Sequence, residues 1–244
     1  MSDYKINILH IYPDLLNLYG DKGNIECLRK RLEWRGIDAT VSSCTMENPK
    51  IDFQDADIIL LGGGLDRELS IVLDRLKEKA EELKSFVESG GTMLAICGGY
   101  QILGKQCFIG ENRTEGLGIL DIVTVKNADN HRFIGDAVIE CDGIPKLVVG
   151  FENHSEKTNI GKYTPFGKVI KGFGNDGTSG FEGVLYKNLI GTYLHGPLLP
   201  KNPKVCDKIL ENALKNKYPD FKELAPLEDG VEELANEYML KRMQ

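Results

Sequence analysis

Several features that often decide a protein's class are missing from this chain of 244 residues. Its six cysteines lie far apart, with no CxxC pair and no Cys/His cluster at the spacing of a zinc site. This pattern indicates a reducing compartment in which most thiols are buried and inert. Structural zinc is disfavoured, and we expect no metal site in the chain.

Long apolar runs and an excess of positive charge are also absent. No stretch approaches the roughly 18 apolar residues of a membrane span, and the N-terminus lacks a signal-peptide pattern. The formal net charge of −7 disfavours nucleic acid or an anionic membrane as the main partner. We therefore expect a cytoplasmic protein that binds no nucleic acid and does not itself insert into a membrane.

The first hundred residues alternate between strand and helix patterns. The runs YKINILHIYP, IDATVSSC, ADIILLGGG and TMLAIC are typical of buried strands, and the segments between them have helical spacing. One of these, RELSIVLDRLKEKAEELKSFVESGG, is expected to form a single long helix. Such alternation is typical of a mostly parallel sheet with helices on both faces.

From about Cys107 to His195 the pattern changes to short strands separated by glycine and asparagine turns, which indicates β-hairpins. Two helical segments close the chain from about residue 202. We predict an α/β three-layer sandwich with a mostly parallel central sheet and extra β-hairpins. With no repeat and no obvious linker, we predict a single domain over residues 1–244.

The segment TMLAICGGYQ, at residues 92–101, places a cysteine at a strand–helix corner. A nucleophile elbow needs small residues two positions either side of the nucleophile, and here these are Ala95 and Gly99. Cys97 then begins a helix, where the dipole and free N–H groups favour a thiolate. The N–H of Gly98 is placed to donate to an oxyanion. A lone cysteine is more often a buried core residue, so further evidence is needed.

Two other segments end buried strands with residues suited to this chemistry. ILLGGGLDRE carries three glycines at positions 62–64, and GTYLHGPLLP ends an apolar run at His195. In an open α/β sheet, ligands bind outside the carboxyl ends of the strands, so these segments should share a crevice with Cys97. A cysteine with a histidine supplies a nucleophile and a proton carrier. No GK[ST] follows the glycines, so they do not form a P-loop.

Taken together, AICGGYQ, LLGGGLDRE and TYLHGPLLP resemble the class I glutamine amidotransferases of the cobyric acid synthase-like branch. Within it, LNLYGDKGNIECLRKR, GFENHSEKT and GTYLHGPLLPKNP resemble the glutaminase subunits of lipid II isoglutaminyl synthases. The resemblance spans nearly the whole chain and implies a flavodoxin-like fold.

The resemblance also implies roles for individual residues. Cys97 attacks the side-chain amide of L-glutamine, and His195 protonates the leaving ammonia and then activates water. Backbone N–H groups of Gly98 and of the glycine loop, at Gly63 and Gly64, hold the oxyanion. Arg132 matches the family arginine associated with substrate, and its fork suits the α-carboxylate of glutamine.

One position departs from the usual pattern. Most class I amidotransferases have a glutamate two residues after the histidine, whereas this chain has Pro197. The cobyric acid-like branch commonly lacks that acid as well. Either another carboxylate of this chain, such as Glu152, orients His195, or a partner subunit supplies the carboxylate. We hypothesise that the partner supplies it, because glutaminase activity would then depend on assembly and less ammonia would be wasted.

Amide formation from a carboxylate needs ATP, and the sequence has no Walker A motif. The resemblance implies a separate Mur-ligase-like subunit that carries ATP and magnesium and amidates D-glutamate of lipid II to D-isoglutamine in peptidoglycan synthesis. This chain would need no cofactor of its own. Its lipid-linked acceptor would bring the complex to the inner face of the membrane.

Other functions stay open at this point. A stand-alone thiol hydrolase also uses a cysteine elbow, and an amidotransferase subunit can serve another acceptor, such as a cobyrinic acid-like carboxylate. A non-catalytic subunit that keeps the elbow as architecture is disfavoured by the intact Cys97 and His195. A nucleotide-binding module lacks the phosphate-binding residues it would need.

Overall fold

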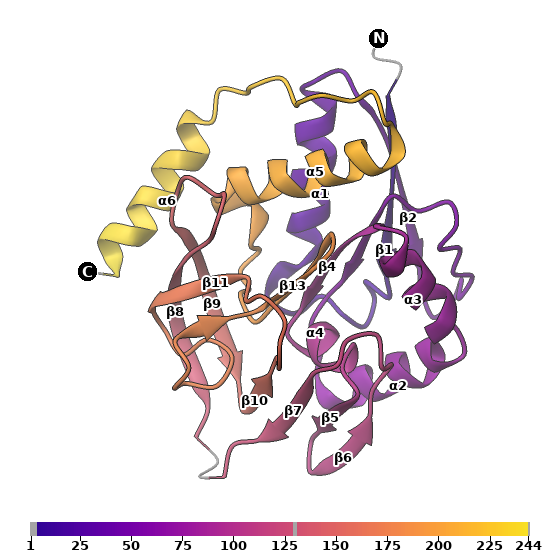
Figure 1. Cartoon of the computed structure of the whole chain (residues 1–244), viewed down its shortest axis with the longest axis vertical. Coiled ribbons are helices and arrows are strands. Elements are labelled where there is room, and N and C mark those ends of the chain that lie inside the picture. The colour runs from indigo at the N-terminus through magenta and orange to yellow at the C-terminus, as the bar shows by residue number, and fades with distance from the viewer. Residues whose placement is uncertain (1–3, 129–130, 244) are drawn as a thin grey trace.

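A computed structural model describes residues 4–128 and 131–243 of the chain. Its centre is a six-stranded sheet in the order β13-β14-β4-β3-β1-β2, as Figure 1 shows in part. The strands are β1 (Lys5–Ile11), β2 (Asp38–Cys44), β3 (Ile58–Leu61), β4 (Thr92–Ile96), β13 (Val184–Tyr186) and β14 (Leu189–Thr192). All neighbours run parallel except the edge hairpin of β13 with β14. The predicted mostly parallel sheet is confirmed.

Helices cover both faces of this sheet, as predicted. The connection from β1 to β2 and the connection from β3 to β4 move along the sheet in opposite directions. Because such crossovers are right-handed, their helices must lie on opposite faces. The helices are α1 (Lys22–Glu33), α2 (Asp66–Lys77), α3 (Ala80–Glu88), α4 (Gly98–Ile102), α5 (Pro203–Lys217) and α6 (Gly230–Arg242). In Figure 1, α1 and α5 lie together, away from α2 and α3.

Two smaller sheets account for the region of short strands. One has the order β10-β7-β5-β6 and the other β12-β11-β8-β9. Their strands are β5 (Gln106–Ile109), β6 (Asn112–Glu115), β7 (Val123–Lys126), β8 (Phe133–Glu140), β9 (Val148–His154), β10 (Glu156–Asn159), β11 (Gly167–Lys171) and β12 (Phe181–Glu182). Nearly all pairings in them are antiparallel. Residues of β9 and β10 in these sheets line one wall of the cleft that is described in the next subsection.

The expected single helix between the third and fourth strands is wrong, because the segment forms two helices. α2 ends at Lys77 and α3 begins at Ala80, with Lys79 in a non-helical conformation between them. The buried residues Leu76 and Leu83 are one heptad apart, so the apolar spacing runs through the break without a signal. The break reorients α3, and both helices still bury their apolar faces against the core.

Two short 3₁₀ turns, η1 (Leu18–Gly20) and η2 (Leu199–Lys201), complete the elements. The C-terminal helices α5 and α6 follow η2, close to the predicted start at about residue 202. The single-domain organisation stays a prediction. Over the described ranges, no helix has both the length and the apolar character that crossing a membrane requires.

A buried ion network fastens the C-terminal helices to α1. Arg31, which is 1% exposed, donates to Asp207 of α5 and to Asp229 just before α6, each at 2.7 Å. Lys204 also pairs with Asp229, at 2.8 Å. Arg35 likewise pairs with Asp207, at 3.0 Å. Removing Arg31 would therefore take from each acid one of two cationic partners and leave the buried donors' place empty.

We therefore predict that Arg31→Ala lowers the free energy of unfolding by about 2–3 kcal/mol, through lost hydrogen bonds to charged groups, measured by urea denaturation. Arg29→Ala is the matched control, since Arg29 lies on the same helix and pairs with Glu26 and Glu33 at the surface. That variant should change stability far less. Equal losses in the two variants would contradict a structural role for the buried network.

Candidate active site

Cys97 occupies a strained corner between β4 and α4. Its φ of 51° lies in the left-handed region, which a non-glycine residue seldom adopts without a structural reason. The N–H of Cys97 donates to the carbonyl of Thr192 at 2.8 Å, which ties the corner to β14. A side chain at Gly99 would lie 2.6 Å from the carbonyl oxygen of Leu61, so the glycine is required. The geometry is that of the predicted nucleophile elbow.

Gly63 lies against both Cys97 and His195. A Cβ built on Gly63 would lie 3.0 Å from Cε1 of His195 and 3.3 Å from Cβ of Cys97. The two predicted catalytic residues therefore meet at one glycine, beyond the carboxyl ends of the neighbouring strands β4 and β14. Any side chain at this position would have to displace one of them, which explains the glycine better than a ligand-binding role does.

His195 is fully buried. Its backbone exchanges hydrogen bonds with Phe151 of β9, with N–O distances of 2.7 and 3.2 Å. Burial, with a smaller contribution from His154, lowers the pKa of His195 to about 3, so the imidazole is neutral. Neither ring nitrogen has a hydrogen-bond partner within the described part of the chain.

Of the three glycines predicted to hold the oxyanion, Gly63 is already engaged. Its N–H donates to Oδ2 of Asp21 at 2.8 Å, so in this arrangement it does not point freely at the site. The N–H of Gly98 interacts with the Cys97 thiol and opposes the rise in its pKa. Gly64 and Gly98 both line the cleft next to Cys97. These two remain our predicted donors.

An open cleft of about 590 Å³ leads to Cys97. Arg132 and Glu156 line it, and both act electrostatically on Cys97. Nη2 of Arg132 donates to Oδ1 of Asn153 at 2.7 Å. His195 does not line this cleft; it is buried next to Gly63, close to Cys97. The structure thus brings Cys97, Gly64, Gly98 and Arg132 to one cavity, with His195 beneath its surface.

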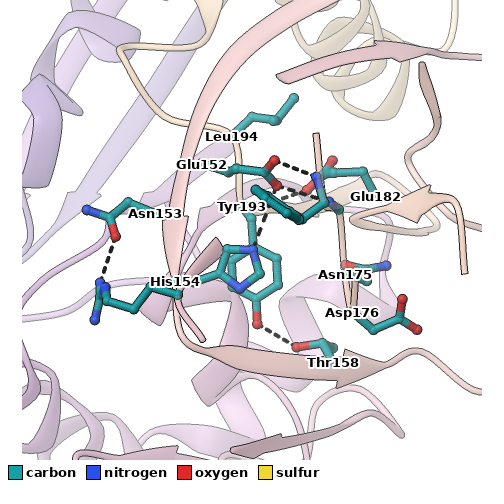
Figure 2. Close-up of polar contacts among 12 residues, drawn as sticks. Glu152, Asn153, His154, Thr158, Asn175, Asp176, Glu182, Tyr193 and Leu194 are labelled. Carbon is teal, nitrogen blue, oxygen red and sulfur yellow. Dashed lines mark hydrogen bonds and ion pairs between the residues drawn. The ribbon is translucent and has the colours of Figure 1, made fainter. Parts of the chain in front are cut away.

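Glu152, one of the candidates for orienting His195, is occupied elsewhere. Its carboxylate accepts hydrogen bonds from the backbone N–H groups of Phe173 and Gly174, at 2.6 and 3.0 Å (Figure 2). It lies 3.8 Å from Nε2 of His154, whose ring stacks on Tyr193 at a centroid distance of 3.7 Å. Glu152 therefore supports the wall behind the site and makes no hydrogen bond to His195.

The structure changes one expectation about Cys97. A helix N-terminus favours the thiolate, but burial dominates and raises the pKa of the Cys97 thiol to about 12. Glu156 adds to the rise, whereas the N–H of Gly98 and the charge of Arg132 oppose it. Both Cys97 and His195 are therefore neutral at physiological pH, and proton transfer between them must accompany attack on a substrate.

The fold and this site together define the class of protein. Residues 7–203 match the CobB/CobQ-like glutamine amidotransferase domain, and the chain belongs to that family. This confirms the family that the sequence motifs resemble.

Two relatives are similar to the chain over nearly its whole length. Both bear the name lipid II isoglutaminyl synthase (glutamine-hydrolyzing) subunit GatD. The protein from Streptococcus pneumoniae is 39% identical and aligns over 96% of this chain and 91% of its own length. The protein from Staphylococcus aureus is 40% identical, over 98% and 96% respectively. A probable cobyric acid synthase from Methanococcus maripaludis is 34% identical, but the match covers only 45% of that protein.

Solved structures support the fold at low sequence identity. A glutamine amidotransferase crystal structure gives a TM-score of 0.56 at 18% identity, covering 84% of this chain and 98% of that one. The glutaminase domain of Trypanosoma brucei CTPS gives a TM-score of 0.55 at 13% identity, covering 90% of this chain and 98% of that one. The predicted fold class is thereby confirmed.

Sequence reasoning assigned no role to several residues at the site. Asp21 holds Gly63, Asn153 holds Arg132, and the ring of Tyr19 lies 4.9 Å from that of His195. Tyr19 and Asp21 are in LNLYGDKGN and Asn153 is in GFENHSEKT, two motifs that carried the resemblance. The motifs marked these segments, but their contacts join residues far apart in the chain.

Because burial raises the pKa of Cys97 to about 12, its thiolate fraction should increase throughout the neutral and alkaline range. We predict that alkylation of Cys97 by iodoacetamide accelerates by about tenfold per pH unit between about pH 7 and 10. Peptide mass spectrometry of Cys97 measures this rate, with Cys97→Ala confirming the assignment. A rate that is already level near pH 7 would contradict a neutral thiol.

Proposed function

We propose that this chain is the glutaminase subunit of a two-subunit amidotransferase that converts D-glutamate of lipid II to D-isoglutamine. The observation that carries the glutaminase role is the placement of Cys97 and His195 against the same glycine, Gly63, with Cys97 lining a cleft that also contains Arg132. The near full-length similarity to two proteins with that function supports the choice of acceptor.

The reaction follows from this geometry. Arg132 binds the α-carboxylate of L-glutamine, which directs the side-chain amide toward Cys97. As sulfur bonds to the amide carbon, the thiol proton passes to His195, and the N–H groups of Gly64 and Gly98 stabilise the oxyanion. The C–N bond then breaks, and His195 returns the proton to the departing ammonia.

The second half of the reaction releases glutamate. His195 takes a proton from water, whose oxygen attacks the thioester carbon. The C–S bond breaks and the sulfur regains a proton, which restores the thiol. Ammonia is delivered to the partner, a Mur-ligase-like subunit that uses ATP and magnesium to activate the acceptor carboxylate.

The partner also supplies the acid that orients His195. Both ring nitrogens of His195 lack hydrogen-bond partners over residues 4–128 and 131–243, and Glu152 is committed to Phe173 and Gly174. A buried imidazole without a partner is a poor base, since nothing fixes its tautomer or stabilises its cation. Glutaminase activity in the isolated chain is therefore expected to be low.

The test is a reconstituted reaction containing this chain, the synthetase subunit, lipid II, ATP, magnesium and glutamine with an isotopically labelled amide nitrogen. We predict that the label appears in the D-isoglutamine product, detected by mass spectrometry. Cys97→Ala should lower glutamine-dependent amidation by about 10³-fold or more, because the covalent route is lost.

Ammonium chloride provides the control for that experiment. Free ammonia bypasses the glutaminase, so the Cys97→Ala complex should amidate lipid II normally when ammonium replaces glutamine. If Cys97→Ala retained glutamine-dependent amidation, the cysteine would be architectural and the glutaminase mechanism would be wrong. Amidation of a cobyrinic acid-like carboxylate, with none of lipid II, would overturn the assigned acceptor.

A further inference from the structure

Tyr19 and Asn153 are hydrogen-bonded to each other, and they contact His195 and Arg132 respectively. Neither residue has a role in the reaction proposed above. Tyr19 belongs to η1, directly before α1, whereas Asn153 lies on β9 in the wall of the cleft. The two residues are 134 positions apart in the sequence, and Nδ2 of Asn153 donates to the Tyr19 hydroxyl.

Asn153 uses both ends of its amide. Its nitrogen binds Tyr19, and its Oδ1 accepts the hydrogen bond from Arg132 at 2.7 Å. Figure 2 shows Asn153 on the outer side of β9, facing away from the buried group of Glu152 and His154. Arg132 is otherwise an exposed side chain, so this bond restricts its guanidinium to the cleft.

The ring of Tyr19 covers His195. The two rings are 4.9 Å apart and tilted by 58°, and Tyr19 also packs edge-on against Phe151 at 5.3 Å. His195 is fully buried while Tyr19 is 41% exposed, so the tyrosine lies between the histidine and solvent.

Tyr19, whose ring covers His195, has an unusual backbone conformation. Its φ of 56° is in the left-handed region, which is uncommon for an aromatic residue. The N–H of Leu18 donates to the carbonyl of Gly63 at 3.1 Å, which fixes the turn to the glycine that lies against Cys97 and His195. Local strain of this kind persists where surrounding contacts impose it, and such places are often functional.

We propose that Tyr19 and Asn153 are positioning residues of the glutaminase reaction: Asn153 aims Arg132 at the substrate carboxylate, and Tyr19, held by Asn153, seals His195 from bulk water. The inference rests on the proposed function. A sealed histidine keeps its neutral form and returns its proton to the leaving ammonia rather than to solvent. The shared amide links substrate binding at Arg132 to closure over His195.

The seal is tested on the isolated chain with diethyl pyrocarbonate, which acylates accessible neutral imidazoles. In the wild type, the exposed His131 should react quickly and the buried His195 slowly. Tyr19→Ala should accelerate modification of His195 by about tenfold or more, with His10 and His154 unchanged, as measured by peptide mass spectrometry. Tyr238→Ala, which removes an exposed tyrosine from α6, is the matched control and should change nothing.

Kinetics of glutamine hydrolysis in the complex with the synthetase subunit then separate the two roles. Asn153→Ala should raise KM by about tenfold with a smaller effect on kcat, because Arg132 loses the bond that orients it. Tyr19→Ala should act mainly on kcat, and Tyr19→Phe, which keeps the covering ring but loses the hydroxyl, should recover most of kcat.

The outcomes distinguish the inference from the function on which it rests. A wild-type complex with no glutaminase activity would overturn the proposed function, whereas the labelling result does not depend on activity. If Tyr19→Ala left both the labelling of His195 and kcat unchanged, the seal would be refuted. If the buried His10 and His154 also became reactive in that variant, the tyrosine would serve general folding instead. An unchanged KM in Asn153→Ala would refute the positioning of Arg132.

Discussion

The convergence of β3, β4 and β14 at their carboxyl ends is the constraint on which the site depends. These strands are adjacent and parallel, so the loops that follow them emerge side by side. β4, which ends at the Cys97 corner, is the middle strand of the three, and the glycine loop after β3 packs so closely on this corner that a Cβ at Gly63 would crowd both Cys97 and His195. Arg132, Gly64 and Gly98, to which we assign substrate binding and oxyanion stabilisation, line the cleft with Cys97, and Tyr19 packs on His195.

Burial of the two reacting side chains also shapes the chemistry. It keeps both of them neutral, by raising the pKa of Cys97 to about 12 and lowering that of His195 to about 3. A neutral pair hydrolyses glutamine slowly until something stabilises the imidazolium. A carboxylate from the synthetase subunit would do so, which would limit the release of ammonia when no acceptor is in place.

The sequence allowed prediction of the sheet, the elbow and the segments that meet at the site, because each depends on local patterns. Cys97, the glycine loop and His195 all end apolar strand runs, and parallel strands bring such ends together. The break between α2 and α3 was not predictable, since the apolar spacing continues from Leu76 to Leu83. Neither was the raised pKa of Cys97, which depends on packing from many elements, nor the contact of Tyr19 with Asn153.

The nucleophilic role of Cys97 is best measured as the intact mass of the chain, in complex with the synthetase subunit, after exposure to a diazo-ketone analogue of glutamine. The analogue requires a glutamine-shaped cleft and a cysteine that becomes nucleophilic when the cleft is filled. We expect one adduct per chain, located at Cys97 and lost in Cys97→Ala. No adduct on the wild-type complex, or an adduct that persists in Cys97→Ala, would contradict that role.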